Sequence, residues 1–174
     1  MKKIFWVDLE MTGLDPYEAV IIEFAGIVTD LELREIADYQ AVVFQPPEEL
    51  NKMNEWNVTT HGASGLLDLI PNGKSLAQVE QEIISFIADQ FGDEKPVIAG
   101  NSIHQDRKFI DRYMKDLADH LHYRMIDVSA FKQVFKHLYG VDVVKKNPHR
   151  ALDDIKASIS ELKEYLGYIN IPQD

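Results

Sequence analysis

Apolar runs separated by polar turns dominate the first part of the chain. Residues 1–10, 19–30 and 39–45 are rich in β-branched and aromatic side chains, which predicts three consecutive strands. Three strands that follow one another with short connections suggest a meander. Shorter apolar runs at 96–102 and 123–128 predict two further strands.

The pattern changes to a helical period after the turn at 70–75. Apolar residues recur there at three- and four-residue spacing, which predicts a helix over 75–91. Further helices are expected at 105–114 and 129–140, and one apolar stripe predicts a last helix over 152–166. Strands followed by alternating strands and helices predict an α/β fold, with a mixed sheet covered by helices, in a single domain over 1–174.

Two acidic residues interrupt the first apolar run. Asp8 and Glu10 lie within "IFWVDLEM". Residues i and i+2 of a strand project to the same side, so both carboxylates would leave a buried strand together. An unpaired buried carboxylate costs several kcal/mol or takes up a proton. We therefore expect a compensating group near these two side chains.

Composition excludes several classes of function. The 174 residues are 45% apolar, as in an ordinary globular domain. The absence of cysteine excludes disulfides, thiolate metal sites and a cysteine nucleophile. The first apolar stretch is too short for a signal peptide or a membrane span, so we expect a soluble cytoplasmic protein. The formal net charge of −11 argues against binding a long nucleic acid through many phosphates, but not against a short one.

More ionisable residues lie at the ends of the predicted elements. Asp106 lies where a strand gives way to a helix, and ligand sites of α/β sheets lie at such carboxyl ends. The stretch "HRALDD" brings His149, Asp153 and Asp154 to the start of the last helix. Taken singly, these residues are also compatible with a helix cap, favourable charge at a helix N-terminus and a surface loop histidine.

Taken together, these residues predict a catalytic site that binds divalent cations. Carboxylates from separate elements suit Mg²⁺ or Mn²⁺. Two such ions about 4 Å apart hold the attacking and leaving oxygens of a phosphoryl displacement. His149 fits the general base that deprotonates the attacking water, because a histidine pKa near ~6.5 suits that role at neutral pH. Cations would also make Asp8 and Glu10 tolerable in a buried strand.

Three segments of the chain resemble the motifs of a known enzyme family. "DLEMTGLD", "GNSIHQD" and "HRALDD" are similar to the three motifs of the DEDDh exonucleases, whose last motif has a histidine five positions before an aspartate. That spacing selects Asp154 over Asp153. A helical wheel agrees, because Asp154 lies about 115° and Asp153 about 145° from the centre of the apolar stripe. The ligand set implied is Asp8, Glu10, Asp106 and Asp154.

Within these exonucleases, the chain resembles the oligoribonuclease family over nearly its whole length. "WNVTTHGASGL" and "HYRMIDVS" are further similar segments, in the same order. The resemblance implies an RNase H-like fold, a homodimer and two divalent cations. It also implies removal of 5′-mononucleotides from the 3′ end of very short RNA, with dinucleotides preferred.

The resemblance implies roles in substrate binding. Leu14 would insert between two bases, and Trp56 and His61 would line the substrate pocket. The structural alternatives are core packing for Trp56 and a polar group at a helix start for His61.

The same resemblance implies roles for four further residues. Ser102, Arg124 and Ser129 would hold the 5′ phosphate, to which Arg124 could donate two hydrogen bonds. Tyr123 would reach the active site from the partner subunit. A surface ion pair is the alternative for Arg124, and an alternating strand aromatic is the alternative for Tyr123.

Three other functions compete with exoribonuclease activity. A DEDDh exonuclease could act on DNA 3′ ends, but the net charge of −11 and the oligoribonuclease segments count against it. A non-catalytic module could bind a dinucleotide without cutting it, and a cation could serve only as a structural staple. Neither of these two functions needs an ionisable histidine such as His149 beside the acidic cluster.

Overall fold

The computed structural model describes residues 2–143 and 150–169, and its centre is a five-stranded sheet in the order β3-β2-β1-β4-β5. The strands β1 (Ile4–Met11), β2 (Ile21–Thr29) and β3 (Glu35–Val42) form an antiparallel meander. The short strands β4 (Ile98–Gly100) and β5 (Met125–Asp127) add to β1 in parallel. The mixed sheet expected from the sequence is therefore confirmed.

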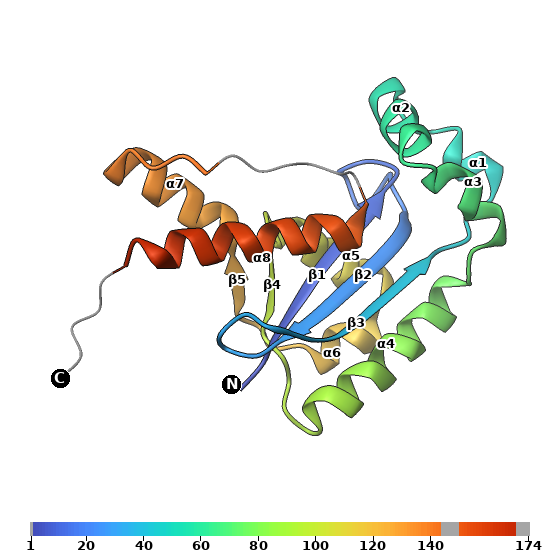
Figure 1. The fold of residues 1–174 in the computed structure, drawn as a ribbon. Coiled ribbons are helices and arrows are strands. Elements are labelled where there is room, and N and C mark those ends of the chain that lie inside the picture. The colour runs from blue at the N-terminus through green and yellow to red at the C-terminus, as the bar shows by residue number, and fades with distance from the viewer. Residues whose placement is uncertain (1, 144–149, 170–174) are drawn as a thin grey trace.

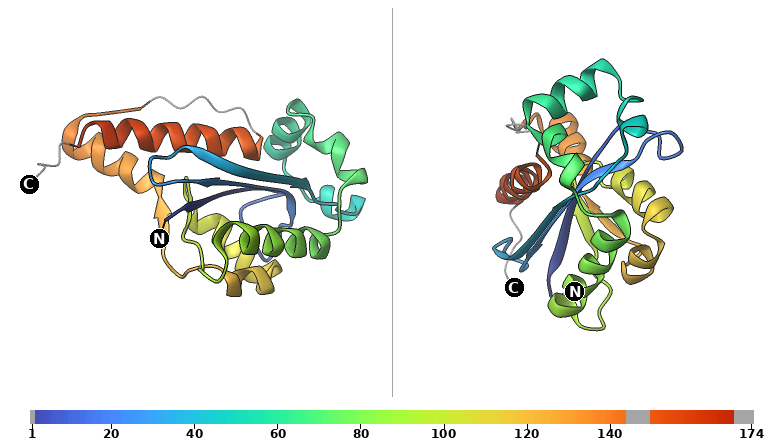
Figure 2. Two further views of the ribbon diagram at one scale, coloured as in Figure 1. Left: turned by 60° about the horizontal axis from the view of Figure 1, so that its bottom comes forward. Right: turned by 90° about the vertical axis from the view of Figure 1, so that its right-hand side faces the viewer.

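Helices cover both faces of this sheet (Figure 1). The helices α7 (Val128–Tyr139) and α8 (Ala151–Gly167) lie on one face, as the left view of Figure 2 shows most clearly. The opposite face carries α4 (Leu76–Phe91), α5 (His104–Tyr113) and α6 (Lys115–His120). Of the helices that the structure describes, none combines the length and the apolar character needed to cross a membrane.

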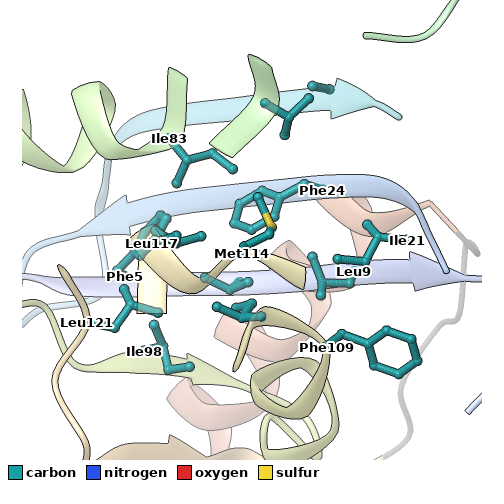
Figure 3. Packing of buried hydrophobic residues seen from close by; sticks show 14 of the residues in the cluster. Phe5, Leu9, Ile21, Phe24, Ile83, Ile98, Phe109, Met114, Leu117 and Leu121 are labelled. Atoms are coloured by element: carbon teal, nitrogen blue, oxygen red, sulfur yellow. The ribbon is translucent and has the colours of Figure 1, made fainter. Parts of the chain in front are cut away.

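The alternation of side chains along β1 divides the core into two parts. Phe5 and Leu9 pack with α4, α5 and α6 (Figure 3), whereas Ile4 and Trp6 pack with α7 and α8. Successive strand residues point to opposite faces, so the even-numbered positions belong to the α8 side. Asp8 and Glu10 therefore leave the sheet on the face that α8 covers.

A helical segment between β3 and α4 was not anticipated. It comprises α1 (Pro47–Leu50), α2 (Glu55–Ala63), α3 (Leu66–Leu69) and a 3₁₀ turn (Ile70–Asn72). The buried side chains of α2 are the polar Asn57 and His61, which contact the carbonyl oxygens of Thr12 at 2.8 Å and Met11 at 3.1 Å. The helix therefore lacks the apolar stripe that identifies a helix in a sequence.

The third strand begins earlier than predicted. Its range is 35–42 rather than 39–45, and its first half is mostly exposed at the edge of the sheet. Polar side chains are common on such edges, so hydrophobic pattern alone misses them. The other predicted strands and helices agree with the structure within two or three residues at either end.

Candidate active site

The carboxyl end of β1 is the place where the predicted acidic residues approach one another. Asp8 and Glu10 are partly buried on the α8 side, and β1 pairs there with Ala25 and Glu23 of β2. The pairing register shifts between Glu10 and Met11, so the strand departs from regular geometry just after the second carboxylate. Such irregularities often reorient side chains beside active sites.

Asp106 reaches the same region from the first turn of α5. Its side chain is 6% exposed, and one carboxylate oxygen accepts a hydrogen bond from the Leu9 backbone N–H at 2.9 Å. Burial raises the pKa of Asp106 from 3.8 to about 7, while the hydrogen bond from Leu9 acts in the opposite direction. The hydrogen bond fixes this carboxyl against Leu9, the residue of β1 that lies between Asp8 and Glu10.

Glu10 experiences the negative charges of its neighbours. Its pKa rises from 4.5 to about 8, chiefly because of burial and then because of repulsion by Glu23, Asp154 and Asp106. The positive charge of Arg150 acts in the opposite direction. The carboxylates of β2, α5 and α8 are thus close enough to Glu10 of β1 to raise its pKa.

The last predicted ligand lies in the first turn of α8. Asp154 is partly buried and contributes to the raised pKa of Glu10, whereas its neighbour Asp153 is exposed. The assignment of Asp154 as a ligand from the motif spacing stays a prediction. His149 precedes the described part of α8 and lies outside the described residues.

The acidic residues form an electrostatic cluster rather than a closed coordination shell. Within residues 2–143 and 150–169, no three histidine, aspartate or glutamate side chains are grouped so that they could already hold a metal ion. The donor set is nonetheless of the right kind, because carboxylate oxygens are the ligands that Mg²⁺ and Mn²⁺ prefer. The mutual repulsion at Glu10 is what a bound cation would relieve.

Two of the three residues assigned to the 5′ phosphate lie together. The hydroxyl oxygens of Ser102 and Ser129 are 3.2 Å apart, between the end of β4 and the start of α7. Arg124 instead lies against the ring of Tyr123, with its guanidinium carbon 5.3 Å from the ring centroid. Both of these side chains are exposed.

Asp127 organises the serine pair, and the sequence analysis did not identify it. One of its carboxylate oxygens accepts hydrogen bonds from the backbone N–H groups of Ser102 and Ser129, both at 3.0 Å, and from the Ser129 hydroxyl. Ser102 has a φ of 52°, a left-handed conformation that is uncommon for a residue with a side chain. The position of Asp127 at the carboxyl end of β5 was the available signal in the sequence.

The residues assigned to the bases differ sharply in exposure. Leu14 is 75% and Trp56 is 65% exposed, so core packing, the alternative considered for Trp56, is wrong. An exposed indole is suited to stacking against a base, and an exposed leucine side chain is suited to inserting between bases. His61 is 2% exposed, and its Nδ1 lies 3.8 Å from a Glu10 carboxylate oxygen. His61 therefore contacts the acidic cluster as well as the β1 backbone.

Glu23 and Arg150 are further residues that the sequence analysis missed. The guanidinium Nη2 of Arg150 donates to a carboxylate oxygen of Glu23 at 2.7 Å. The available signal was Glu23 itself, a single acid within the apolar run "AVIIEFAGIV". An acid in such a run needs a partner for the same reason as Asp8 and Glu10.

Comparison with known proteins identifies the family. Residues 5–162 match the family model described as "Exonuclease". An oligoribonuclease from Pseudomonas putida is 45% identical over 170 residues, which cover 94% of each chain. An oligoribonuclease from Francisella tularensis is 43% identical over 165 residues, which cover 93% of each chain.

Solved structures agree at the level of the fold. Exonuclease I from Methylocaldum szegediense superimposes with a TM-score of 0.67 at 19% identity, over 97% of this chain and 41% of that one. Exonuclease I from E. coli in complex with a dA16 oligonucleotide gives a TM-score of 0.67 at 15% identity, over 94% of this chain and 40% of that one. This chain thus spans about two fifths of those proteins. It has the exonuclease fold of the RNase H-like type, and it belongs to the exonuclease family and, within that family, to the oligoribonucleases.

Proposed function

We propose that this protein is a 3′-to-5′ exoribonuclease that releases 5′-mononucleotides from very short oligoribonucleotides and prefers dinucleotides. The observation that carries the proposal is the convergence of Glu10, Asp106 and Asp154 from three elements at one end of the sheet. The names of the full-length relatives support RNA rather than DNA as the substrate. Across residues 2–143 and 150–169 the strands form one sheet, which supports one exonuclease domain over 1–174. The cytoplasmic location stays a prediction.

Two divalent cations, Mg²⁺ or Mn²⁺, fit this donor set. Asp8, Glu10, Asp106 and Asp154 would hold them through carboxylate oxygens. When bound, the cations would activate the attacking water and stabilise the charge that develops on the phosphate. Asp106 is prepared for this role by its hydrogen bond from the Leu9 N–H, which fixes one oxygen and leaves the other for a ligand.

The other assigned residues would position the substrate and move the proton. His149 would accept the proton of the attacking water as general base. Leu14 and Trp56, both exposed, would contact the bases. The paired Ser102 and Ser129 would bind the 5′ phosphate.

The remaining residues assigned to the substrate, Arg124 and His61, would limit the length of the RNA that binds. Arg124, which now contacts the Tyr123 ring, would bind the same 5′ phosphate, since its two parallel N–H donors suit a phosphate. Buried His61 would complete the pocket beside Glu10. A 5′ phosphate bound at Ser102 and Ser129 would close the pocket beyond a dinucleotide, which is the basis of the expected dinucleotide preference.

A homodimer is the second part of the proposal. Tyr123 is 74% exposed, and in the proposed dimer it would extend into the partner and complete the partner's active site. The helix α7 also exposes the apolar side chains Val134, Leu138 and Tyr139. Val134 and Tyr139 line a groove of about 680 Å³, together with residues that include Phe131 and Tyr168. An exposed apolar and aromatic surface of this kind suits a subunit interface.

Digestion of 5′-labelled RNAs from two to ten nucleotides tests the proposal, with matched DNA oligonucleotides as a comparison. We expect products that shorten one nucleotide at a time from the 3′ end, and the highest kcat/KM for the dinucleotide. Equal or faster cleavage of the matched DNA would favour a DNA exonuclease. Tight binding of the dinucleotide without cleavage would favour a binding module.

A further inference from the structure

A buried carboxylate lies next to the acidic cluster without belonging to the proposed ligand set. The side chain of Glu23 on β2 is 0% exposed. Glu23 is the cross-strand partner of Glu10, so both side chains project from the α8 face of the sheet. A buried charge in this position requires compensation.

Glu23 is compensated by donors from two separate segments. Arg150 donates from Nη2 to Oε1 at 2.7 Å and from Nε to Oε2 at 3.4 Å. The backbone N–H of Ala151 donates to Oε2 at 3.2 Å. Gln40 of β3 donates to Oε1 at 3.0 Å. Each carboxylate oxygen therefore accepts two hydrogen bonds, and the carboxylate links β2, β3 and the start of α8.

These contacts replace an ordinary helix cap. Arg150 is the N-cap residue of α8, with extended backbone and no capping bond from its own side chain. The first N–H groups of a helix need external acceptors, and a negative charge is favourable there. Glu23 supplies both to Ala151 from the neighbouring strand. The start of α8 at Ala151 is thereby fixed to the sheet, two residues after His149 and three residues before Asp154.

We propose that Glu23 and Arg150 are positioning residues that fix the first turn of α8, so that Asp154 meets Glu10 and Asp106 in the geometry that cation binding requires. The inference rests on the proposed function, because it takes Asp154 as a ligand.

A double substitution separates positioning from simple stabilisation. Arg150→Met alone would leave the Glu23 charge buried without its ionic partner, which is strongly destabilising. Glu23→Gln together with Arg150→Met removes both charges, and the glutamine oxygen still accepts from Ala151. Arg34→Met is the matched control, because Arg34 forms an exposed ion pair with Asp30 at 2.7 Å on the turn between β2 and β3.

The measurement is Mn²⁺ binding without substrate, followed by electron paramagnetic resonance, together with kcat/KM on a dinucleotide and the Tm. We expect the double variant to bind Mn²⁺ about 10- to 100-fold more weakly, the usual effect of losing groups that orient metal ligands. At fixed Mn²⁺, kcat should fall by a similar factor while KM changes little. Arg34→Met should leave all three unchanged.

Two results would overturn the inference. A folded double variant with a lower Tm but the Mn²⁺ midpoint and kcat of the unaltered protein would mean that the pair only stabilises the fold. If the double variant does not fold, Arg150→Lys takes its place, because lysine keeps the charge but loses the paired donors. Arg150→Lys should still weaken Mn²⁺ binding, and unchanged Mn²⁺ binding by this variant would contradict the inference. Failure of the unaltered protein to bind Mn²⁺ and cleave RNA would instead refute the proposed function.

Discussion

The substitution Glu10→Gln should stabilise the metal-free protein while removing its activity. The pKa of Glu10 rises from 4.5 to about 8 on folding because the carboxylate is buried among other negative charges. A group whose pKa is raised by folding favours the folded state fully at low pH, and this contribution is lost as the pH rises through the folded pKa. The loss therefore occurs between about pH 4.5 and pH 8.

The magnitude follows from the size of the shift. One pKa unit corresponds to about 1.4 kcal/mol, so ionisation of Glu10 should lower the free energy of unfolding by about 4 kcal/mol at pH 8. Glutamine avoids this cost but must bury an amide, so we expect a net gain of roughly 2–4 kcal/mol. For a chain of this size the Tm should rise by about 4–16 °C.

The assay is thermal or urea unfolding of both proteins in chelator, at pH 5 and at pH 8. The gain should be large at pH 8 and nearly absent at pH 5. Glu18→Gln, at an exposed glutamate in the connection between β1 and β2, is the matched control and should change neither value. Adding Mn²⁺ should stabilise the unaltered protein more than the variant. A Glu10→Gln protein that is no more stable than the original at pH 8 would refute the electrostatic reasoning.

Four further substitutions test individual roles. Asp154→Ala should abolish turnover with the fold intact by circular dichroism, and measurable turnover at saturating Mg²⁺ would remove Asp154 from the ligand set. His149→Ala should lower kcat by about 10²- to 10⁴-fold with little change in dinucleotide affinity; an unchanged rate of the chemical step in single-turnover kinetics would exclude it as the base. Arg124→Ala should lower kcat/KM on a 5′-phosphorylated dinucleotide by about tenfold or more, since a charge-assisted contact contributes roughly 1.5–3 kcal/mol. On a dinucleotide without the 5′ phosphate, the variant and the unaltered protein should have the same kcat/KM. Tyr123→Ala should impair turnover without dissociating a dimer measured by light scattering, and full activity of this variant, or of a monomer, would contradict the role across the interface.

Part of the acidic cluster could be predicted from local sequence, and part of it could not. Asp8 and Glu10 were conspicuous because two carboxylates on one face of an apolar strand demand an explanation. Glu23 carries the same signal in weaker form, as a single acid in an apolar run. Its partners Gln40 and Arg150 lie 17 and 127 residues away along the chain, so no local pattern connects them. Only the fold reveals that a residue of the last motif compensates it.

The helices between β3 and α4 show a different limit. The buried face of α2 consists of Asn57 and His61, which are held by hydrogen bonds to backbone oxygens at the end of β1. Periodicity of apolar residues identifies helices that pack through hydrophobic contact, and it does not detect a helix docked by polar contacts. By contrast, α4 has a regular apolar stripe through Val79, Ile83 and Ile87, and its predicted range was nearly correct.

The most direct test is the hydrolysis of a 5′-phosphorylated diribonucleotide by the unaltered protein, measured as release of mononucleotides. The reaction should be run with Mg²⁺, with Mn²⁺ and with excess chelator, beside the Asp154→Ala variant. We expect rapid conversion to two 5′-mononucleotides with either cation, and none with chelator or with the variant. Undiminished hydrolysis in chelator, or no hydrolysis with either cation, would contradict the assignment of Asp8, Glu10, Asp106 and Asp154 as the centre of a metal-dependent exoribonuclease.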